Sequence, residues 1–391
     1  MFFVPRIAWD YGTFKPGVYV SSSDFLEKLN LFGGFDMNTK GEFDAIGMLD
    51  FKAFRPTFFA LGYYLTRKDD ERFDDPFVIV DQVEDENGNL VPVYDKYGVD
   101  YKFNLMLFDL GARMQLLPYV ESELRASVSR YEANLKYEDG MTFHYTYFIG
   151  RSYQARFDFN TMPAMIKGNV HPRAGTRAQL TVGFEDNKFI DGFEVNSDAL
   201  TLQEVYTNYK FWRLEGDVTH WYNPMGRLTV QPRLRFGYLD KQVDPFMDLY
   251  AGGLHGMRGY SFYSLGGTRR VIGSMALRHP LWEPNRPRTG WIHWDGLYAG
   301  IFGDVGDAWR ERDFDTDKLK TDIGLEVRAK FYSWYGYPTA VTFSAARAFD
   351  TVSVTENDIT TVYDPDWKFY FTVLFNFETI FPLGGTRGDH R

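Results

Sequence analysis

The stretch 319-LKTDIGLEVRAKF-331 alternates between apolar and polar side chains from end to end. In an extended chain, one face would carry Leu319, Thr321, Ile323, Leu325, Val327, Ala329 and Phe331. The other face would carry ions of both signs, namely Lys320, Asp322, Glu326, Arg328 and Lys330. Because successive side chains of a strand point to opposite faces, the pattern predicts a β-strand. Its polar face holds too many ions for a dry core, and its apolar face is long enough for a tilted strand that crosses a bilayer.

The same alternation recurs along most of the chain, as in 212-WRLEGDVTH-220, 227-RLTVQPRLRFGY-238 and 367-WKFYFTVLFNF-377. It defines sixteen segments, at about 2–9, 16–24, 28–37, 42–53, 57–68, 101–116, 119–135, 142–159, 175–187, 205–222, 227–240, 268–281, 296–309, 319–332, 339–349 and 367–378. Pro5 lies in the first of them and is expected either within that strand or just before its start. Pro232 falls inside the eleventh, where it removes a backbone donor and is expected to mark a local bulge.

The connections between these segments tend to alternate in length. Those at 25–27, 54–56, 117–118, 223–226 and 333–338 are short, and those at 69–100, 188–204, 241–267 and 350–366 are long. The connections 160–174 and 282–295 are longer than this rule expects. Short inner turns, long outer loops and an even strand number are typical of an outer-membrane barrel. We therefore predict an all-β, sixteen-stranded antiparallel transmembrane β-barrel over residues 1–378, followed by a C-terminal tail, 379–391.

The composition agrees with this fold. The 36 Phe, 26 Tyr and 9 Trp residues exceed the needs of an ordinary soluble core but suit aromatic girdles at two membrane interfaces. No apolar run is long enough for a membrane helix. The alternative is a soluble all-β protein such as a pair of sandwiches or a propeller. It is disfavoured because the strands are long for a sandwich and no repeat of blade length is present.

Charge and cysteine usage narrow the partners. The net charge is −10 and no basic patch is evident, so nucleic acid is not an expected partner. The chain has no cysteine, which fits an exported protein without disulfides and equally fits many cytosolic ones. The start at Met1 lacks the features of a signal peptide, so an exported protein would be represented here by its mature chain or by an excised domain. The expected location is the bacterial outer membrane, with its lipids as partners.

The insert 241–267 departs from the alternation, and 250-YAGGLHGMRGYSFYSLGG-267 holds six glycines and a single arginine, Arg258. This insert connects the eleventh and twelfth predicted strands. A loop displayed to solvent would be more polar, so we expect this one to be buried in the barrel lumen. A buried Arg258 would need a carboxylate, which guanidinium binds in a planar fork. Asp304, flanked by Gly303 and Gly306 two strands later, is the proposed partner. The alternative is a solvated arginine and an unrelated lumen acid.

Two motifs in this region resemble signatures of the Omp85 superfamily, the bacterial surface antigen (D15) barrels. Met257-Arg258-Gly259-Tyr260 is similar to the V/I-R-G-F/Y loop signature, and Phe302, Asp304 and Gly306 match F-x-D-x-G on the thirteenth strand. The resemblance implies a sixteen-stranded barrel whose sixth outer loop enters the lumen, where its arginine meets the strand-thirteen aspartate. It also implies a role in inserting proteins into the outer membrane or translocating them across it.

Three features depart from the family pattern. The glutamate expected two residues before the arginine of E-L-R falls at Ala276, so one lumen carboxylate of the expected network is absent. No periplasmic POTRA domain precedes the barrel, and an upstream periplasmic module is therefore one expected partner outside this chain. The chain also continues past the last strand, whereas family members commonly end on its aromatic residue.

Other sites have weaker support. The seven histidines lack metal spacing, no nucleophile elbow or phosphate loop is present, and we expect no enzymatic activity, metal or cofactor. The acidic runs 69-DDERFDD-75 and 85-DENGN-89 are more typical of a solvated outer loop than of a Ca²⁺ site. Residues 69–100 are predicted to form an extracellular hairpin around Asn87-Gly88.

Three functions follow as hypotheses. The first is protein insertion, translocation or export of an attached module, with Arg258 locked to Asp304 and client proteins as partners. The second is a passive porin-like channel, which would not need the motif pair. The third is an inert anchor or scaffold for surface or periplasmic proteins.

Overall fold

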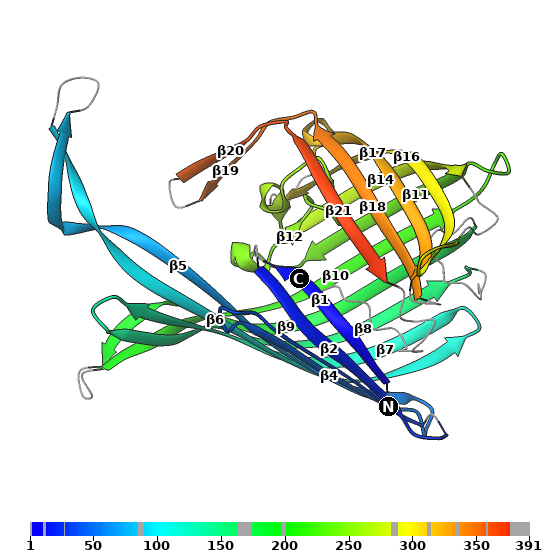
Figure 1. Ribbon diagram of the computed structural model, residues 1–391, viewed down its shortest axis with the longest axis horizontal. Coiled ribbons are helices and arrows are strands. Elements are labelled where there is room, and N and C mark those ends of the chain that lie inside the picture. The colour runs from blue at the N-terminus through cyan, green and yellow to red at the C-terminus, as the bar shows by residue number, and fades with distance from the viewer. Residues whose placement is uncertain are drawn as a thin grey trace. The chain divides into compact units, whose positions relative to one another are not determined.

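The computed structural model describes residues 2–10, 13–26, 28–84, 90–162, 174–196, 201–282, 288–310, 314–333, 337–356 and 359–375. Almost all of this part is β-strand (Figure 1). Three short 3₁₀ helices occur, η1 (Pro245–Met247), η2 (Phe262–Ser264) and η3 (Thr316–Lys318). Across the described ranges, no helix has the length and apolarity needed to span a membrane.

Sixteen of the described strands have nine residues or more, which confirms the predicted strand number and fold class. They are β1 (Phe2–Asp10), β2 (Thr13–Ser23), β3 (Leu29–Met37), β4 (Phe43–Phe51), β5 (Thr57–Glu84), β6 (Leu90–Leu117), β7 (Val120–Tyr137), β8 (Thr142–Asn160), β9 (Gly175–Asn196), β10 (Thr201–Trp221), β11 (Thr229–Leu239), β14 (Arg269–Trp282), β16 (Ile292–Trp309), β17 (Lys320–Ser333), β18 (Tyr337–Ala348) and β21 (Trp367–Phe375). The shorter strands are β12 (Leu249–Tyr250), β13 (Gly266–Gly267), β15 (Arg288–Thr289), β19 (Val352–Glu356) and β20 (Ile359–Tyr363).

The sixteen long strands and β15 belong to one sheet. Each strand from β1 to β5 pairs antiparallel with the next in sequence. The order β10, β11, β14, β16, β17, β18, β21 is also antiparallel at every step. Two hairpins, β12–β13 and β19–β20, lie outside this sheet.

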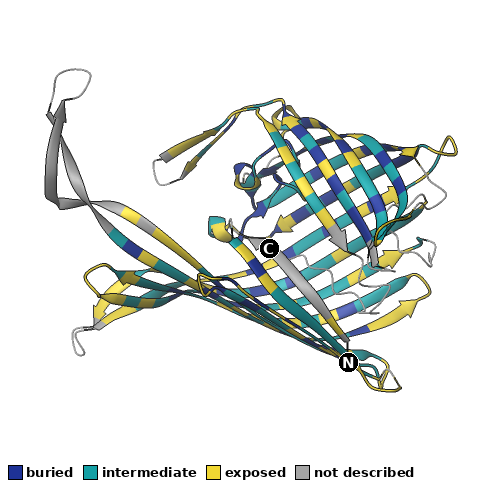
Figure 2. Ribbon diagram, in the orientation of Figure 1, coloured by how far each residue is buried: buried dark blue, intermediate teal, exposed yellow. Residues whose placement is uncertain are grey.

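The chain divides into two compact units. The first comprises residues 1–113, 124–153 and 185–210, and the second comprises residues 114–123, 154–184 and 211–391. In both units large apolar side chains are exposed while many charged ones are buried, and Figure 2 shows the alternation along the strands. In β17, for example, Leu325 is 57% exposed, whereas Asp322 and Glu326 are buried. This reversal of the soluble pattern is what strands with a lipid-facing apolar side and an enclosed polar side require.

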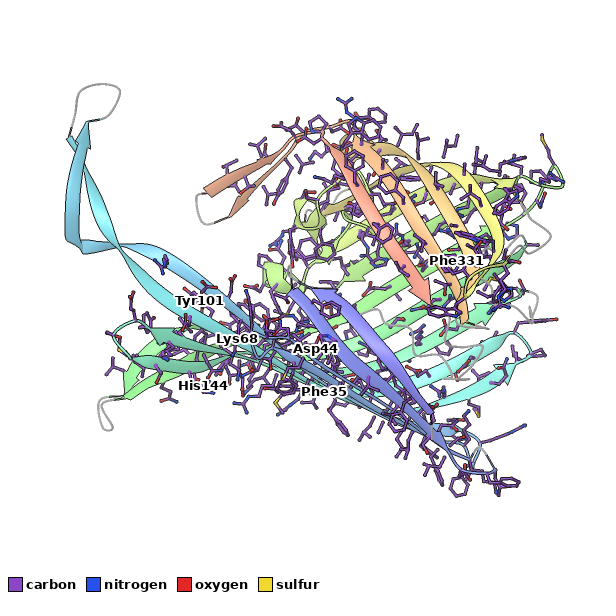
Figure 3. All side chains as sticks on the ribbon, viewed as in Figure 1. Phe35, Asp44, Lys68, Tyr101, His144 and Phe331 are labelled. Carbon is purple, nitrogen blue, oxygen red and sulfur yellow. The ribbon has the colours of Figure 1, made fainter. Side chains whose placement is uncertain are left out.

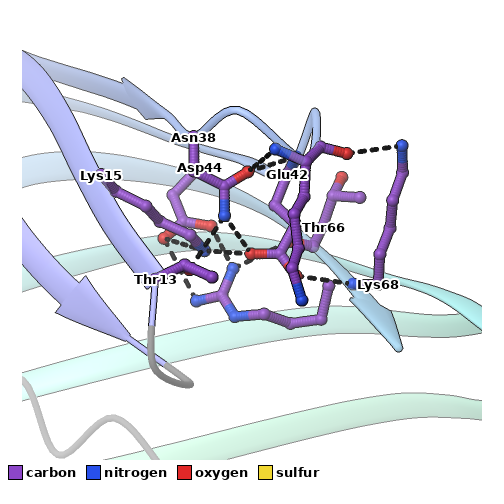
Figure 4. Close-up of polar contacts among 9 residues, drawn as sticks. Thr13, Lys15, Asn38, Glu42, Asp44, Thr66 and Lys68 are labelled. Atoms are coloured by element: carbon purple, nitrogen blue, oxygen red, sulfur yellow. Dashed lines mark hydrogen bonds and ion pairs between the residues drawn. The ribbon is translucent and has the colours of Figure 1, made fainter. Parts of the chain in front are cut away.

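A polar cluster holds β2 to β5 together in the first unit (Figure 4). Lys15 Nζ lies 3.2 Å from Glu42 Oε2 and 3.9 Å from Asp44 Oδ2, and Arg67 Nη1 lies 2.5 Å from Asp44 Oδ1. The carboxylate of Glu42 also accepts from the side chain of Asn38. Figure 3 shows the positions of Asp44 on β4 and Phe35 on β3, whose side chains differ sharply in burial. Because every charge here has an opposite partner, we assign the cluster a structural role.

Several local expectations need correction. At 69–100, where the sequence predicts an extracellular hairpin, β5 and β6 run to Glu84 and from Leu90 and pair antiparallel with each other; the extracellular location stays a prediction. The connection expected at 188–204 is shorter than predicted, because β9 and β10 run to Asn196 and from Thr201. These extensions remain extended because antiparallel pairing satisfies the backbone. In β5 the pairing with β6 runs from Thr57 to Glu84, with register shifts between Asp75 and Asp81. Asn87-Gly88 lies outside the described residues, as does the tail 379–391.

The two prolines also have definite places. The predicted bulge at Pro232 is wrong, because β11 keeps an unbroken register with β14 through Pro232 and Met275. Proline has no backbone N–H, and Pro232 lies where the pairing of β11 with β10 is interrupted. This gap falls between Arg233, the last residue of the regular pairing, and Val230, which forms an isolated bridge. Pro5 lies within β1, opposite Val18, so the strand does not start after it.

Candidate functional site

The connection between β11 and β14 is a folded loop. Within it, Asp244 caps η1 by accepting from the backbone N–H of Phe246. The short hairpin β12–β13 then pairs Leu249 with Gly267. Among the buried residues of this loop are Ala251, Met257, Tyr260 and Leu265. A loop with so many buried apolar side chains cannot stand free in solvent, which explains why this sequence lacks the polar composition of an outer loop.

Arginines from the sheet hold the stem of this loop by its backbone. Arg213 on β10 donates to the carbonyl of Met247 at 3.0 Å, and Arg270 on β14 donates to that of Tyr250 at 2.9 Å. Arg235 on β11 donates to the carbonyl of Gly256 at 3.2 Å. Arginine has five donors in a fixed fork and so can satisfy several acceptors of an irregular backbone. The stem is thereby attached to three neighbouring strands.

Arg258 stands at the tip of the loop and meets the next strands along the sheet. Its Nε lies 3.4 Å from Asp304 Oδ2 on β16, and its Nη1 lies 3.6 Å from Glu326 Oε2 on β17. Its Cζ lies 3.1 Å from the centroid of the Phe302 ring. The guanidinium therefore uses one flat face for the aromatic ring and its edges for two carboxylates. Arg258 is 15% exposed and Asp304 is 1% exposed, so water screens this pair poorly.

Phe302 can serve as this platform because its neighbours across the sheet are small. It pairs with Ala276 on β14 and with Gly324 on β17, and Gly324 pairs with Ala346 on β18. A Cβ at Gly324 would overlap the Phe302 ring. Ala276, Phe302 and Ala346 accordingly form one buried apolar cluster. The glycine lets the ring lie across the neighbouring strand, beneath the guanidinium.

The two residues after Arg258 fix the loop tip to the wall. Gly259 donates its N–H to Asp322 Oδ2 at 2.7 Å, and a Cβ at Gly259 would lie 2.6 Å from the backbone nitrogen of Ala348. Only glycine permits this approach. The Tyr260 hydroxyl lies 2.9 Å from the carbonyl of Thr321 and 3.1 Å from Asp350 Oδ2. Burial, followed by the Asp350 charge, raises the pKa of Tyr260, so its hydroxyl stays protonated and can donate.

The other motif residues also take part. Met257 is fully buried in the apolar cluster beneath the loop. Gly306 pairs with Ile272 on β14, where a Cβ would overlap the backbone of that strand. Tyr370 on the last strand, β21, donates its hydroxyl to the carbonyl of Arg258 at 2.8 Å. The loop tip thus contacts β16, β17, β18 and β21.

Glu326 is a participant that motif reasoning missed. It is buried and forms ion pairs with Arg278 on β14 and with Arg258 on the loop. Arg278 also donates a hydrogen bond to the side chain of Gln231 on β11. The sequence expected one carboxylate fewer at this place because Ala276 occupies the usual position. Glu326 lies on the polar face of the alternating stretch 319–331, and that face was the one available signal. Which arginine it would meet depends on the register between strands, which alternation does not give.

The arrangement can hold an irregular loop at a defined place inside a polar enclosure. Its chemistry is that of paired charges and backbone hydrogen bonds, since each arginine meets a carboxylate or a carbonyl. In the described part of the chain, no group of three or more His, Asp or Glu side chains is placed to hold a metal ion.

Comparison of the sequence with protein-family models and with characterised proteins finds no match. Comparison of the structure finds CdiB from Escherichia coli, with a TM-score of 0.53 and 11% identity over 95% of this chain and 62% of that one. BamA from Haemophilus ducreyi lacking POTRA domains 1–3 gives 0.55 and 10%, over 95% and 69%. CdiB from Acinetobacter baumannii gives 0.50 and 11%, over 95% and 58%. The chain therefore has the fold of these proteins, and it spans about three fifths of the length of the two CdiB chains.

Proposed function

We propose that this chain is the barrel of a bacterial outer-membrane protein that moves other polypeptides into or across that membrane, or exports a module attached to it. The observation that carries the proposal is the set of polar contacts that attach the β11–β14 loop to the strands. Its stem is held by strand arginines, and its tip is placed by Arg258 against Asp304 and Glu326. The fold shared with BamA and CdiB supports the same class of work.

In this proposal the loop is a plug and a register clamp. Arg258 joins the loop to β16 and β17, and Tyr370 extends the contact to β21. A client would pass or insert only as these contacts rearrange, because paired charges inside a poorly solvated enclosure have few alternative partners. The pair of Arg258 and Asp304 would then contribute to the free energy needed to displace the loop.

A folding assay in lipid vesicles tests the proposal. The purified chain is reconstituted, a urea-unfolded outer-membrane β-barrel protein is added as client, and its folded fraction is followed by gel migration. We expect faster client folding than in empty vesicles, and loss of that gain in Arg258→Ala. Arg227→Ala, which alters an exposed turn arginine, should keep the gain. Equal client folding with and without the chain would refute an insertion role.

The same vesicles separate the two alternatives. Steady ion conductance without any effect on client folding would favour a passive channel. Absence of both conductance and folding activity, together with a tightly co-purifying partner, would favour an anchor. Translocation or self-export is instead read by protection of the passenger from external protease.

A further inference from the structure

The second unit contains an apolar cluster that the ion pairs do not explain. Its buried members come from the loop, from the sheet and from the connection between β18 and β21, and they are Ala251, Met257, Tyr260, Leu265, Ile272, Ala308, Ala348 and Val352. Met257 and Ile272 are each 0% exposed. The loop is therefore attached in two chemically different ways, by charge at Arg258 and by apolar packing behind it.

The connection between β18 and β21 supplies the outermost part of this cluster. It forms the hairpin β19–β20, which joins the ends of those strands in Figure 1. Val352 is 9% exposed within the cluster, and Val354 and Tyr363 pack against it. At the foot of the hairpin, Asp350 faces the hydroxyl of Tyr260. Strand β19 also lies beside η2 of the loop.

The two faces of the hairpin differ, as a covering element requires. Val352 pairs with Tyr363, and both turn toward the cluster. Ser353 pairs with Val362 on the opposite face, where Val362 is 54% exposed. Alternation thus places the same residue type, valine, on both faces of one short hairpin.

We propose that the hairpin β19–β20 is a latch that closes over the lumenal loop and holds it in place independently of the Arg258 ion pair. The sheet contributes only Ile272, Ala308 and Ala348 to the buried members of this cluster, and two of these three are alanines with little apolar surface. The hairpin supplies the missing apolar cover, and release of the loop requires the hairpin to lift first. The inference goes beyond the proposed function, because it concerns the position of the loop whatever the barrel transports.

The chain has no cysteine, which makes a single introduced thiol a clean reporter. Ser264→Cys places one in η2, at a buried position of the loop beside the latch. Its reaction with a charged maleimide reports how often this part of the loop opens. On this background, Val354→Asp should speed labelling by about tenfold or more, since a carboxylate in an apolar contact disfavours the closed state. Val362→Asp, on the exposed face, is the matched control and should leave the rate unchanged.

A second variant guards against effects of the introduced charge. Replacing residues 352–363 by a short Gly-Ser link removes the latch altogether and should raise the labelling rate at least as much. Each variant is first checked for folding by its gel migration before and after boiling. The proposal would be overturned if both latch variants were labelled at the same rate as the Ser264→Cys protein without further changes. Failure of both to fold while Val362→Asp folds would also overturn it, since a latch outside the sheet is dispensable for sheet formation. The assay involves no client, so its outcome is separate from that of the transport assay.

Discussion

At the scale of single residues, Arg258 depends on the shape of its guanidinium. The group lies over the Phe302 ring while its edges reach Asp304 and Glu326, which a lysine ammonium could not do at once. The sequence pointed to Asp304 because glycines flank it. It placed Glu326 on a polar face without indicating which arginine Glu326 meets, and it gave no indication that Tyr370 reaches the loop. Both contacts depend on the register of β17 and β21 against their neighbours.

Arg258→Ala and Asp304→Ala should each destabilise the folded protein by about 3 kcal/mol, because each leaves a buried charge with fewer partners. The double variant should cost clearly less than the sum of the two single variants, since the second removal no longer breaks a pair. The measurement is urea unfolding in detergent, followed by gel migration. Arg227→Ala should unfold like the wild type. Strictly additive losses would show that the two residues act separately.

At the scale of elements, the sequence predicted the strands well because lipid on one side and a polar enclosure on the other impose a strict period of two. It failed where that period carries no signal. The part of β9 beyond residue 187 carries apolar residues at both odd and even positions, such as Phe189 and Ile190, and β19 and β20 are only five residues each. These segments are strands because neighbouring segments pair with them, and their own sequences do not predict it.

The contact between β16 and β17 depends on one small residue. Gly324→Val should force the Phe302 ring off its neighbouring strand and remove the platform beneath Arg258. We expect a loss of stability of about 1–3 kcal/mol from overpacking. The labelling rate of a Ser264→Cys reporter should also rise. Gly47→Val on β4 is the matched control, because a Cβ there meets no atom within 4 Å. Equal behaviour of the two variants would contradict the platform role of Phe302.

At the scale of the whole molecule, the exposed apolar faces of both units require a lipid or detergent environment. Detergent-extracted protein should therefore keep its sheet in mild sodium dodecyl sulfate and migrate differently before and after boiling, because a continuous antiparallel ladder leaves few open backbone groups. Gel electrophoresis of boiled and unboiled samples is the measurement. Identical migration of the two, for a sample whose circular dichroism shows β structure, would argue against a membrane barrel.

The sequence by itself determined the strand number, the face of each strand that meets lipid, and the place of the irregular loop, because these follow from local alternation and its interruption. Tertiary structure alone decided that Glu326 bridges Arg258 and Arg278, that Phe302 lies over Gly324, and that β19–β20 packs against the apolar cluster of the loop. Those contacts join residues that are distant in the chain. They are set by the register of paired strands and by the room that glycine leaves between them, and neither is written in the alternation of any single segment.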